Sequence, residues 1–215
     1  MAAALAAALF AAPVMADAIA ASNGLVPLPC DRVGPLQPVT RGYCAAGRHY
    51  VTPPTRAALV RVADAVAREH PGAVVRYMEA SWPSAERPMP PHVSHGDGRQ
   101  IDLAIFYEDR RGRLRPPPTA SGYGAFEPPR REGERACVGM GGHHAAPDPS
   151  AKRTWRLAHE PTAALLQRLS GEPRVRRIFI EPHLKARLGF ARDAKVRFAG
   201  CKVARHDDHL HVDFR

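Results

Sequence analysis

The sequence predicts an α+β fold, in which a small, mainly antiparallel sheet is polar on one face and packs against helices on the other. Three segments of the 215-residue chain support this. Residues 54–69 repeat apolar side chains at helical spacing, whereas residues 100–107 and 206–215 alternate apolar and polar side chains as strands do. A sheet that is apolar on only one face must bury that face against another layer.

The first 18 residues, MAAALAAALFAAPVMADA, are almost entirely small and apolar. This run is shorter than the roughly 20 residues of a membrane span, so no stable membrane insertion is expected. Its end fits a small-residue cleavage site. We therefore expect a signal peptide over residues 1–18, a periplasmic location and one domain over residues 19–215. No Lys or Arg precedes the apolar run, and the alternative is a cytosolic protein with an Ala-rich terminus.

The chain carries a formal net charge of +10, which favours anionic partners. Its basic residues are scattered, as in the segments 110–113 and 174–177, without the interleaved aromatic residues that stack on bases. Nucleic acid is therefore not an expected partner. For an exported protein, the anionic peptides of the cell wall are the expected partner, and a merely soluble basic surface is the alternative.

Four cysteines, Cys30, Cys44, Cys137 and Cys201, are present without Cys-x-x-Cys spacing. A zinc ribbon is therefore not expected, and an even count in an exported chain suggests two disulfides. Of the three possible pairings we favour Cys30–Cys44, which closes a short loop, with Cys137–Cys201. Buried reduced cysteines are the alternative.

Between the termini, the periodicity predicts the following elements. Residues 19–54 form an irregular N-terminal wrap, and a helix over 54–69 ends at His70. They are followed by a strand over 73–78, a loop over 81–91 and a long irregular loop over 108–150. One or two helices over 150–170, interrupted at Pro161, come next. A strand over 177–181 and a short helix over 182–188 precede the final strand.

The last ten residues concentrate three of the chain's eleven histidines within six positions. In a strand, His209, His211 and Asp213 point to one face, and Leu210, Val212 and Phe214 to the other. Two imidazoles on one face of a rigid strand can serve one cation, and His206 arrives from the preceding loop. We therefore interpret this strand as one half of a metal site.

The other ligands are expected from the strand over 100–107, whose alternation places Asp102 on one face. Burying a carboxylate there is costly unless it is paired or bound to a metal. His95 lies seven residues earlier, on a Gly-bearing turn, and can fold back over Asp102. Taken alone, Asp102 could instead pair with an Arg. His70, His159 and His183 are interpreted as helix-end or structural residues, and His143 and His144 as solvated; none is included in the site.

Three segments carry a resemblance to a known family: SHGDGRQIDL (94–103), RIFIEPHLK (177–185) and HDDHLHVDF (206–214). Together they resemble the penicillin-insensitive murein endopeptidases. These enzymes belong to the LAS group of zinc peptidases, with the lysostaphin-type and D-Ala-D-Ala peptidases and the hedgehog signalling domain. The resemblance covers roughly residues 75–215. Two features depart from the family pattern. Arg205 stands where the family usually has a small residue before the histidine cluster, and residues 108–150 do not align with the family.

The resemblance implies a zinc site on one sheet face, with His95, Asp102 and His211 as ligands. His209 would act on the attacking water or the oxyanion, and His206 would be a second polarising group. It implies hydrolysis of peptide cross-links in peptidoglycan, at the D-alanyl to meso-diaminopimelyl bond. The alternatives are a D,D- or L,D-carboxypeptidase acting on wall peptides and a zinc-bearing cell-wall-binding module without activity. Asp207 and Asp208 are expected to fix the imidazole tautomers.

Overall fold

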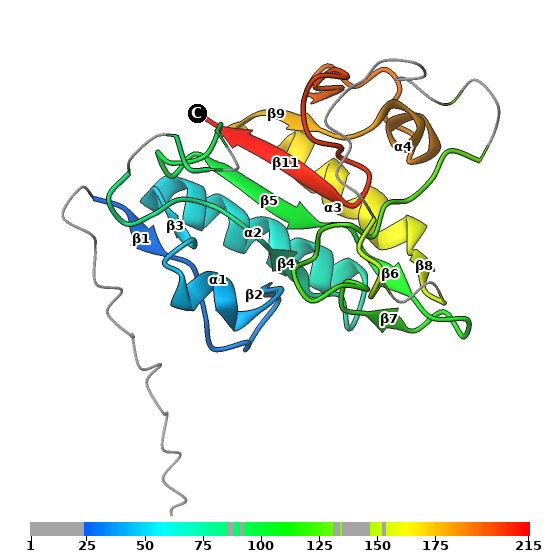
Figure 1. The fold of residues 1–215 in the computed structure, drawn as a ribbon, viewed down its shortest axis with the longest axis horizontal. Coiled ribbons are helices and arrows are strands. Elements are labelled where there is room, and N and C mark those ends of the chain that lie inside the picture. The colour runs from blue at the N-terminus through cyan, green and yellow to red at the C-terminus, as the bar shows by residue number, and fades with distance from the viewer. Residues whose placement is uncertain (1–23, 86–87, 91–92, 131–133, 135–146, 152–153) are drawn as a thin grey trace, which may run out of the picture.

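The structure is a computed structural model that describes residues 24–85, 88–90, 93–130, 134, 147–151 and 154–215 (Figure 1). Its elements, in chain order, are β1 (Val26–Pro27), β2 (Leu36–Pro38), α1 (Arg41–Ala45), β3 (Tyr50–Val51), α2 (Pro53–Glu69), β4 (Val75–Tyr77), β5 (Gln100–Ala104), β6 (Tyr107–Glu108), β7 (Leu114–Arg115), β8 (Arg156–Leu157), α3 (His159–Gly171), β9 (Val175–Phe179), α4 (Pro182–Arg187), β10 (Val196–Arg197) and β11 (His209–Phe214). The described residues thus form helices and several sheets, which agrees with the predicted α+β class, although the sequence predicts only one small sheet.

The main sheet has six strands in the order β10-β9-β11-β5-β4-β2. Its four central strands, β9, β11, β5 and β4, pair antiparallel, whereas β10 and β2 join the two edges as parallel strands. Three of the five strand pairings are antiparallel, which agrees with the predicted mainly antiparallel sheet, and the two parallel pairings lie at its edges. Strand β11, the C-terminal strand, lies between β5 and β9 (Figure 1).

The register of β11 against β5 determines which side chains lie together on each face of the sheet. Leu210 pairs with Leu103 and Val212 with Ile101, and all four side chains are buried in the core. The intervening pair, His211 opposite Asp102, points to the other face because side chains alternate along a strand. The apolar alternation that buries one face therefore also places the polar residues together on the other.

Helices α2 and α3 pack against each other and against the apolar face of the sheet, behind β5 and β11 in Figure 1. Helix α2 begins where the Thr52 hydroxyl accepts a hydrogen bond from the Thr55 amide at 3.3 Å, followed by a proline at its first position. Its C-cap is His70, which confirms the predicted helix end.

Several predicted elements differ from the structure. Pro161 does not interrupt a helix, because it lies in the first turn of α3, where a missing backbone N–H breaks no hydrogen bond. The N-terminal wrap contains α1 and three short strands, of which β2 joins the main sheet. The predicted loop over 108–150 contains β7, which forms a separate three-stranded sheet with β6 and β8.

Cys30 and Cys44 form a disulfide, which confirms the predicted pairing. Cys201 is also disulfide-bonded, and Cys137, its predicted partner, lies outside the described residues. The predicted signal peptide over 1–18 and the pair His143 and His144 lie outside them too. None of the helices that the structure describes is long and apolar enough to cross a membrane.

Candidate metal centre

Two neighbouring strands bring His211 and Asp102 into direct contact. They are register partners on β11 and β5, and the Nδ1 atom of His211 lies 2.8 Å from Oδ1 of Asp102. Both side chains are buried. The sheet register, rather than a flexible loop, therefore sets their separation.

The turn before β5 delivers His95 to the same point. Its Nε2 atom lies 3.2 Å from Nδ1 of His211 and 3.4 Å from Oδ1 of Asp102. The turn is held in place at Gly98, whose amide donates a hydrogen bond to the Ser81 hydroxyl at 2.7 Å. Gly98 has a φ of +76°. A Cβ atom at position 98 would lie 2.8 Å from the Thr52 nitrogen, so the close approach requires glycine.

Hydrogen bonds to the outer ring nitrogens determine which atoms of the two histidines face each other. Nδ1 of His95 lies 2.9 Å from the Ala80 carbonyl and must donate to it, which leaves the lone pair on Nε2. Nε2 of His211 lies 3.3 Å from Oδ1 of Asp213, which favours a proton there and the lone pair on Nδ1.

Three acceptor atoms therefore converge within 3.4 Å: Nε2 of His95, Oδ1 of Asp102 and Nδ1 of His211. A cation between them, either a proton on His211 or a metal ion, offsets the cost of bringing acceptors together in a buried place. Ligand atoms of a tetrahedral zinc site, bound at about 2.0–2.2 Å, lie about 3.3–3.6 Å apart. The separations of 3.2 and 3.4 Å from His95 are close to this range, and the 2.8 Å between His211 and Asp102 is shorter. These three residues could therefore hold a metal ion, as the sequence predicts.

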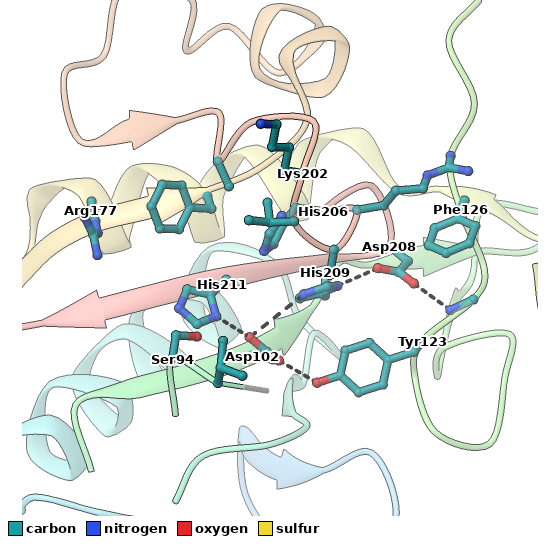
Figure 2. Close-up of a pocket in the computed structure, with 17 residues that line it drawn as sticks. Ser94, Asp102, Tyr123, Phe126, Arg177, Lys202, His206, Asp208, His209 and His211 are labelled. Atoms are coloured by element: carbon teal, nitrogen blue, oxygen red, sulfur yellow. Dashed lines mark hydrogen bonds and ion pairs between the residues drawn. The ribbon is translucent and has the colours of Figure 1, made fainter. Parts of the chain in front are cut away.

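The two remaining histidines of the C-terminal segment lie beside this group. Nε2 of His209 lies 3.9 Å from Oδ1 of Asp102, while its Nδ1 lies 2.5 Å from Oδ1 of Asp208 (Figure 2). The ring of His206 is centred 4.9 Å from that of His209 and 5.9 Å from that of His211. The structure thus brings all five predicted site residues together.

The electrostatic surroundings hold Asp102 ionised. Burial opposes ionisation, but the electrostatic interactions with His95 and His209 and the hydrogen bond to His211 outweigh it, so the pKa of Asp102 lies well below its usual value. For His211, burial lowers the pKa, yet hydrogen bonds to Asp102 and Asp213 raise it to about 9 in the metal-free protein. Burial also lowers the pKa of His209, but the negative charges of Asp102 and Asp208 outweigh this effect and raise it above its usual value.

The two aspartates before His209 have different roles. Asp208 contacts the imidazole of His209, which agrees with the predicted fixing of its tautomer. Asp207 does not contact an imidazole, because its carboxylate pairs with Arg205, whose Nε donates to Oδ1 at 3.0 Å. The prediction for Asp207 is therefore wrong. Arg205 also stacks over Phe126, with its guanidinium 4.0 Å from the ring centre.

Two residues that contact the site are absent from the sequence-based prediction. The hydroxyl of Tyr123 donates to Oδ2 of Asp102 at 2.5 Å, and the backbone N–H of Gly124 donates to Oδ2 of Asp208 at 2.6 Å. Both come from the segment 108–150, which has no helical or strand periodicity. The only local signal is the pair of glycines that flank Tyr123.

A pocket of about 940 Å³ opens onto the candidate centre. It is lined by Asp102, His206, His209 and His211 together with Val93, Ser94, Tyr123, Gly124, Phe126, Arg177, Phe179, Ala199, Lys202, Val203, Ala204, Arg205 and Asp208. The pocket therefore combines an apolar, partly aromatic wall with basic side chains, and a substrate can reach the centre through it.

A second cluster, Cys30, Cys44 and His49, also has metal-ligand residue types within 4.8 Å of one another. Its two sulfur atoms are joined in a disulfide, and the thiolates that bind metals are not present. Of the two clusters found among the described residues, the one at His95, Asp102 and His211 is the candidate metal centre.

No family model matches the sequence, and no curated protein matches it significantly. The family resemblance therefore rests on the segments 94–103, 177–185 and 206–214 alone. In the structure these segments overlap β5, β9 and β11, which are adjacent strands of one sheet.

Proposed function

We propose that this protein is a zinc peptidase that hydrolyses peptide cross-links of peptidoglycan. The observation that carries the proposal is the convergence of His95, Asp102 and His211, of which Asp102 and His211 line a pocket together with His209. The three resembling segments, distant in sequence, lie on adjacent strands around this point. Such an arrangement is what a hydrolytic metal site requires: three protein ligands and access from solvent.

The ligand types favour zinc. Two imidazole nitrogens and one carboxylate oxygen suit zinc, whereas magnesium and calcium prefer oxygen ligands alone. Each ligand is also oriented by a further hydrogen bond: His95 to a carbonyl, His211 to Asp213, and Asp102 from Tyr123. When bound, zinc would polarise the scissile carbonyl and lower the pKa of the attacking water.

Proton transfer is assigned to His209. Its Nδ1–H donates to Asp208, so the lone pair is on Nε2, on the side of Asp102. A neutral imidazole held in this tautomer can take a proton from the attacking water and return it to the amine leaving group. His206 lies within reach as a second polarising group, because its ring is centred 4.9 Å from that of His209.

The pocket suits a peptide that carries free carboxylates. Lys202, Arg205 and Arg177 line it, with the Arg205 guanidinium over the Phe126 ring and that of Arg177 over the Phe179 ring. Arg177 and Arg205 are paired with Asp213 and Asp207, respectively, whereas Lys202 is exposed. Lys202 is therefore the cation best placed to meet a substrate carboxylate. Wall peptides supply such groups on either side of a cross-link.

The same cation supports a second candidate, a D,D- or L,D-carboxypeptidase, because Lys202 could bind a terminal carboxylate beside the scissile bond. A third candidate, a zinc-bearing binding module, would use the same ligands without turnover. Export to the periplasm is part of the proposal, and the Cys30–Cys44 disulfide is compatible with that oxidising compartment.

Digestion of purified cross-linked peptidoglycan, with the products resolved by mass, distinguishes these functions. We expect conversion of dimeric to monomeric muropeptides, abolished by a chelator and restored by zinc. Release of single alanine or another terminal residue would instead establish the carboxypeptidase. If the protein carries stoichiometric zinc and yields no product, the peptidase is contradicted and the binding module is the remaining function.

A further inference from the structure

One short turn contacts both halves of the candidate site. Tyr123 reaches the metal half, where its hydroxyl donates to Oδ2 of Asp102 at 2.5 Å. The next residue, Gly124, reaches the catalytic half, where its backbone N–H donates to Oδ2 of Asp208 at 2.6 Å. Figure 2 shows the Tyr123 hydroxyl pointing to Asp102, and Gly124 follows Tyr123 directly in the chain.

Each contact determines which oxygen of a carboxylate remains for the site. Because Tyr123 binds Oδ2 of Asp102, Oδ1 is the atom that faces His95 and His211. Because Gly124 binds Oδ2 of Asp208, Oδ1 is the atom that accepts from Nδ1 of His209. Without these donors, either carboxylate could rotate and present both oxygens inward.

The turn itself is anchored from outside the site. The Ser121 carbonyl accepts a hydrogen bond from the buried Tyr43 hydroxyl at 2.7 Å, and the Gly122 amide donates to the Thr119 hydroxyl at 3.1 Å. Gly124 has φ +85°, and a Cβ atom there would lie 2.8 Å from that of Asp148. A position that combines this backbone conformation with such close packing admits only glycine.

We propose that Tyr123 is a positioning residue for the metal ligand Asp102, and that Gly124 positions His209 through Asp208. One turn then aligns the metal with the proton-transfer group, so that loss of the Tyr123 hydroxyl changes the metal site itself. The inference rests on the metal centre of the proposed function. It assigns a role to a segment that has no counterpart in the family resemblance.

The test compares Tyr123→Phe with Tyr107→Phe. Tyr107 is a matched control because it is also buried and its hydroxyl also bonds to this region, at the Ala125 carbonyl, without contacting a site carboxylate. Zinc affinity is measured by competition with a chromophoric chelator, and the visible spectrum is recorded with cobalt in place of zinc. Neither measurement depends on peptidase activity.

We expect Tyr123→Phe to weaken zinc binding about 10- to 100-fold and to change the cobalt spectrum. Tyr107→Phe and Tyr43→Phe each remove a hydrogen bond that anchors the turn without touching Asp102, so both should weaken binding by a much smaller factor and leave the spectrum unchanged. Unchanged affinity and spectrum in Tyr123→Phe, with zinc bound by the wild type, would overturn this inference and leave the proposed function intact. Failure of the wild type to bind any metal would overturn both.

Discussion

The imidazole of His209 is held by Asp208, whose Oδ1 lies 2.5 Å from Nδ1 of the ring. This bond leaves Nε2 as the proton acceptor near the metal ligands, and without it the ring could adopt the other tautomer. Asp208→Asn should therefore lower kcat by roughly 10²-fold or more while zinc affinity stays within about twofold of wild type. Steady-state kinetics on a defined cross-linked muropeptide, with zinc content measured in parallel, provide the check.

Asp207→Asn is the matched control for that variant. Asp207 is the neighbouring buried aspartate, but it pairs with Arg205 and not with an imidazole. Asp207→Asn should lower kcat much less than Asp208→Asn does. Equal losses in the two variants would show that the effect comes from disturbing the segment and not from the tautomer of His209.

Zinc binding should depend on pH because a proton competes for the same atom. Burial lowers the pKa of His211, but Asp102 and Asp213 raise it to about 9 in the metal-free protein. Zinc must displace that proton, so affinity should fall about tenfold for each pH unit below about 9 and level off above it. Competition titrations from pH 6 to about 10 would measure this slope; a flat profile would contradict the assignment of His211 as a ligand.

Lys202 should determine how well the pocket binds anionic peptides. Lys202→Glu replaces an exposed cation at the rim with an anion, and should raise KM for a carboxylate-bearing muropeptide about three- to tenfold with little change in kcat. When the carboxylate of the same peptide is amidated, KM should no longer differ between Lys202→Glu and the wild type. Arg110→Glu makes the same charge change on an exposed residue that does not line the pocket, and an equal rise in KM there would point to net charge alone.

The Cys30–Cys44 disulfide should stabilise the fold without acting on the metal centre. It joins residues separated by 14 positions, and closing a loop of that length contributes about 3 kcal/mol. The double variant Cys30→Ser/Cys44→Ser should lower the free energy of unfolding by about that amount in urea titrations and leave zinc affinity unchanged. A loss of zinc binding in the folded variant would contradict the separation of the two clusters.

The parts of the site that could be predicted from sequence are those built on strands. Alternation along residues 100–107 and 206–215 assigns faces, and the apolar pairs that bury the opposite face also fix the register of His211 against Asp102. His95 could be placed because a Gly-bearing turn leads directly into β5. In each case a pattern spread over several residues carries the information.

The parts that could not be predicted lack such a pattern. Tyr123 reaches Asp102 from a segment whose shape is set by distant anchors, among them the Tyr43 hydroxyl, and a single aromatic residue between two glycines has no periodicity to interpret. The strands β6, β7 and β8 have two residues each, too few for alternation to show. The parallel pairing of β2 with β4 is likewise a long-range contact without a local signal.

The most direct test of the account is native mass spectrometry of the purified protein, with its disulfides intact, after dialysis against a small excess of zinc. We predict one zinc ion per chain in the wild type, none in His211→Ala, and one in His159→Ala, whose imidazole bonds only to the Arg187 carbonyl among the contacts described. A wild type without zinc, or a His211→Ala variant that retains it with wild-type affinity, would contradict the metal centre at His95, Asp102 and His211.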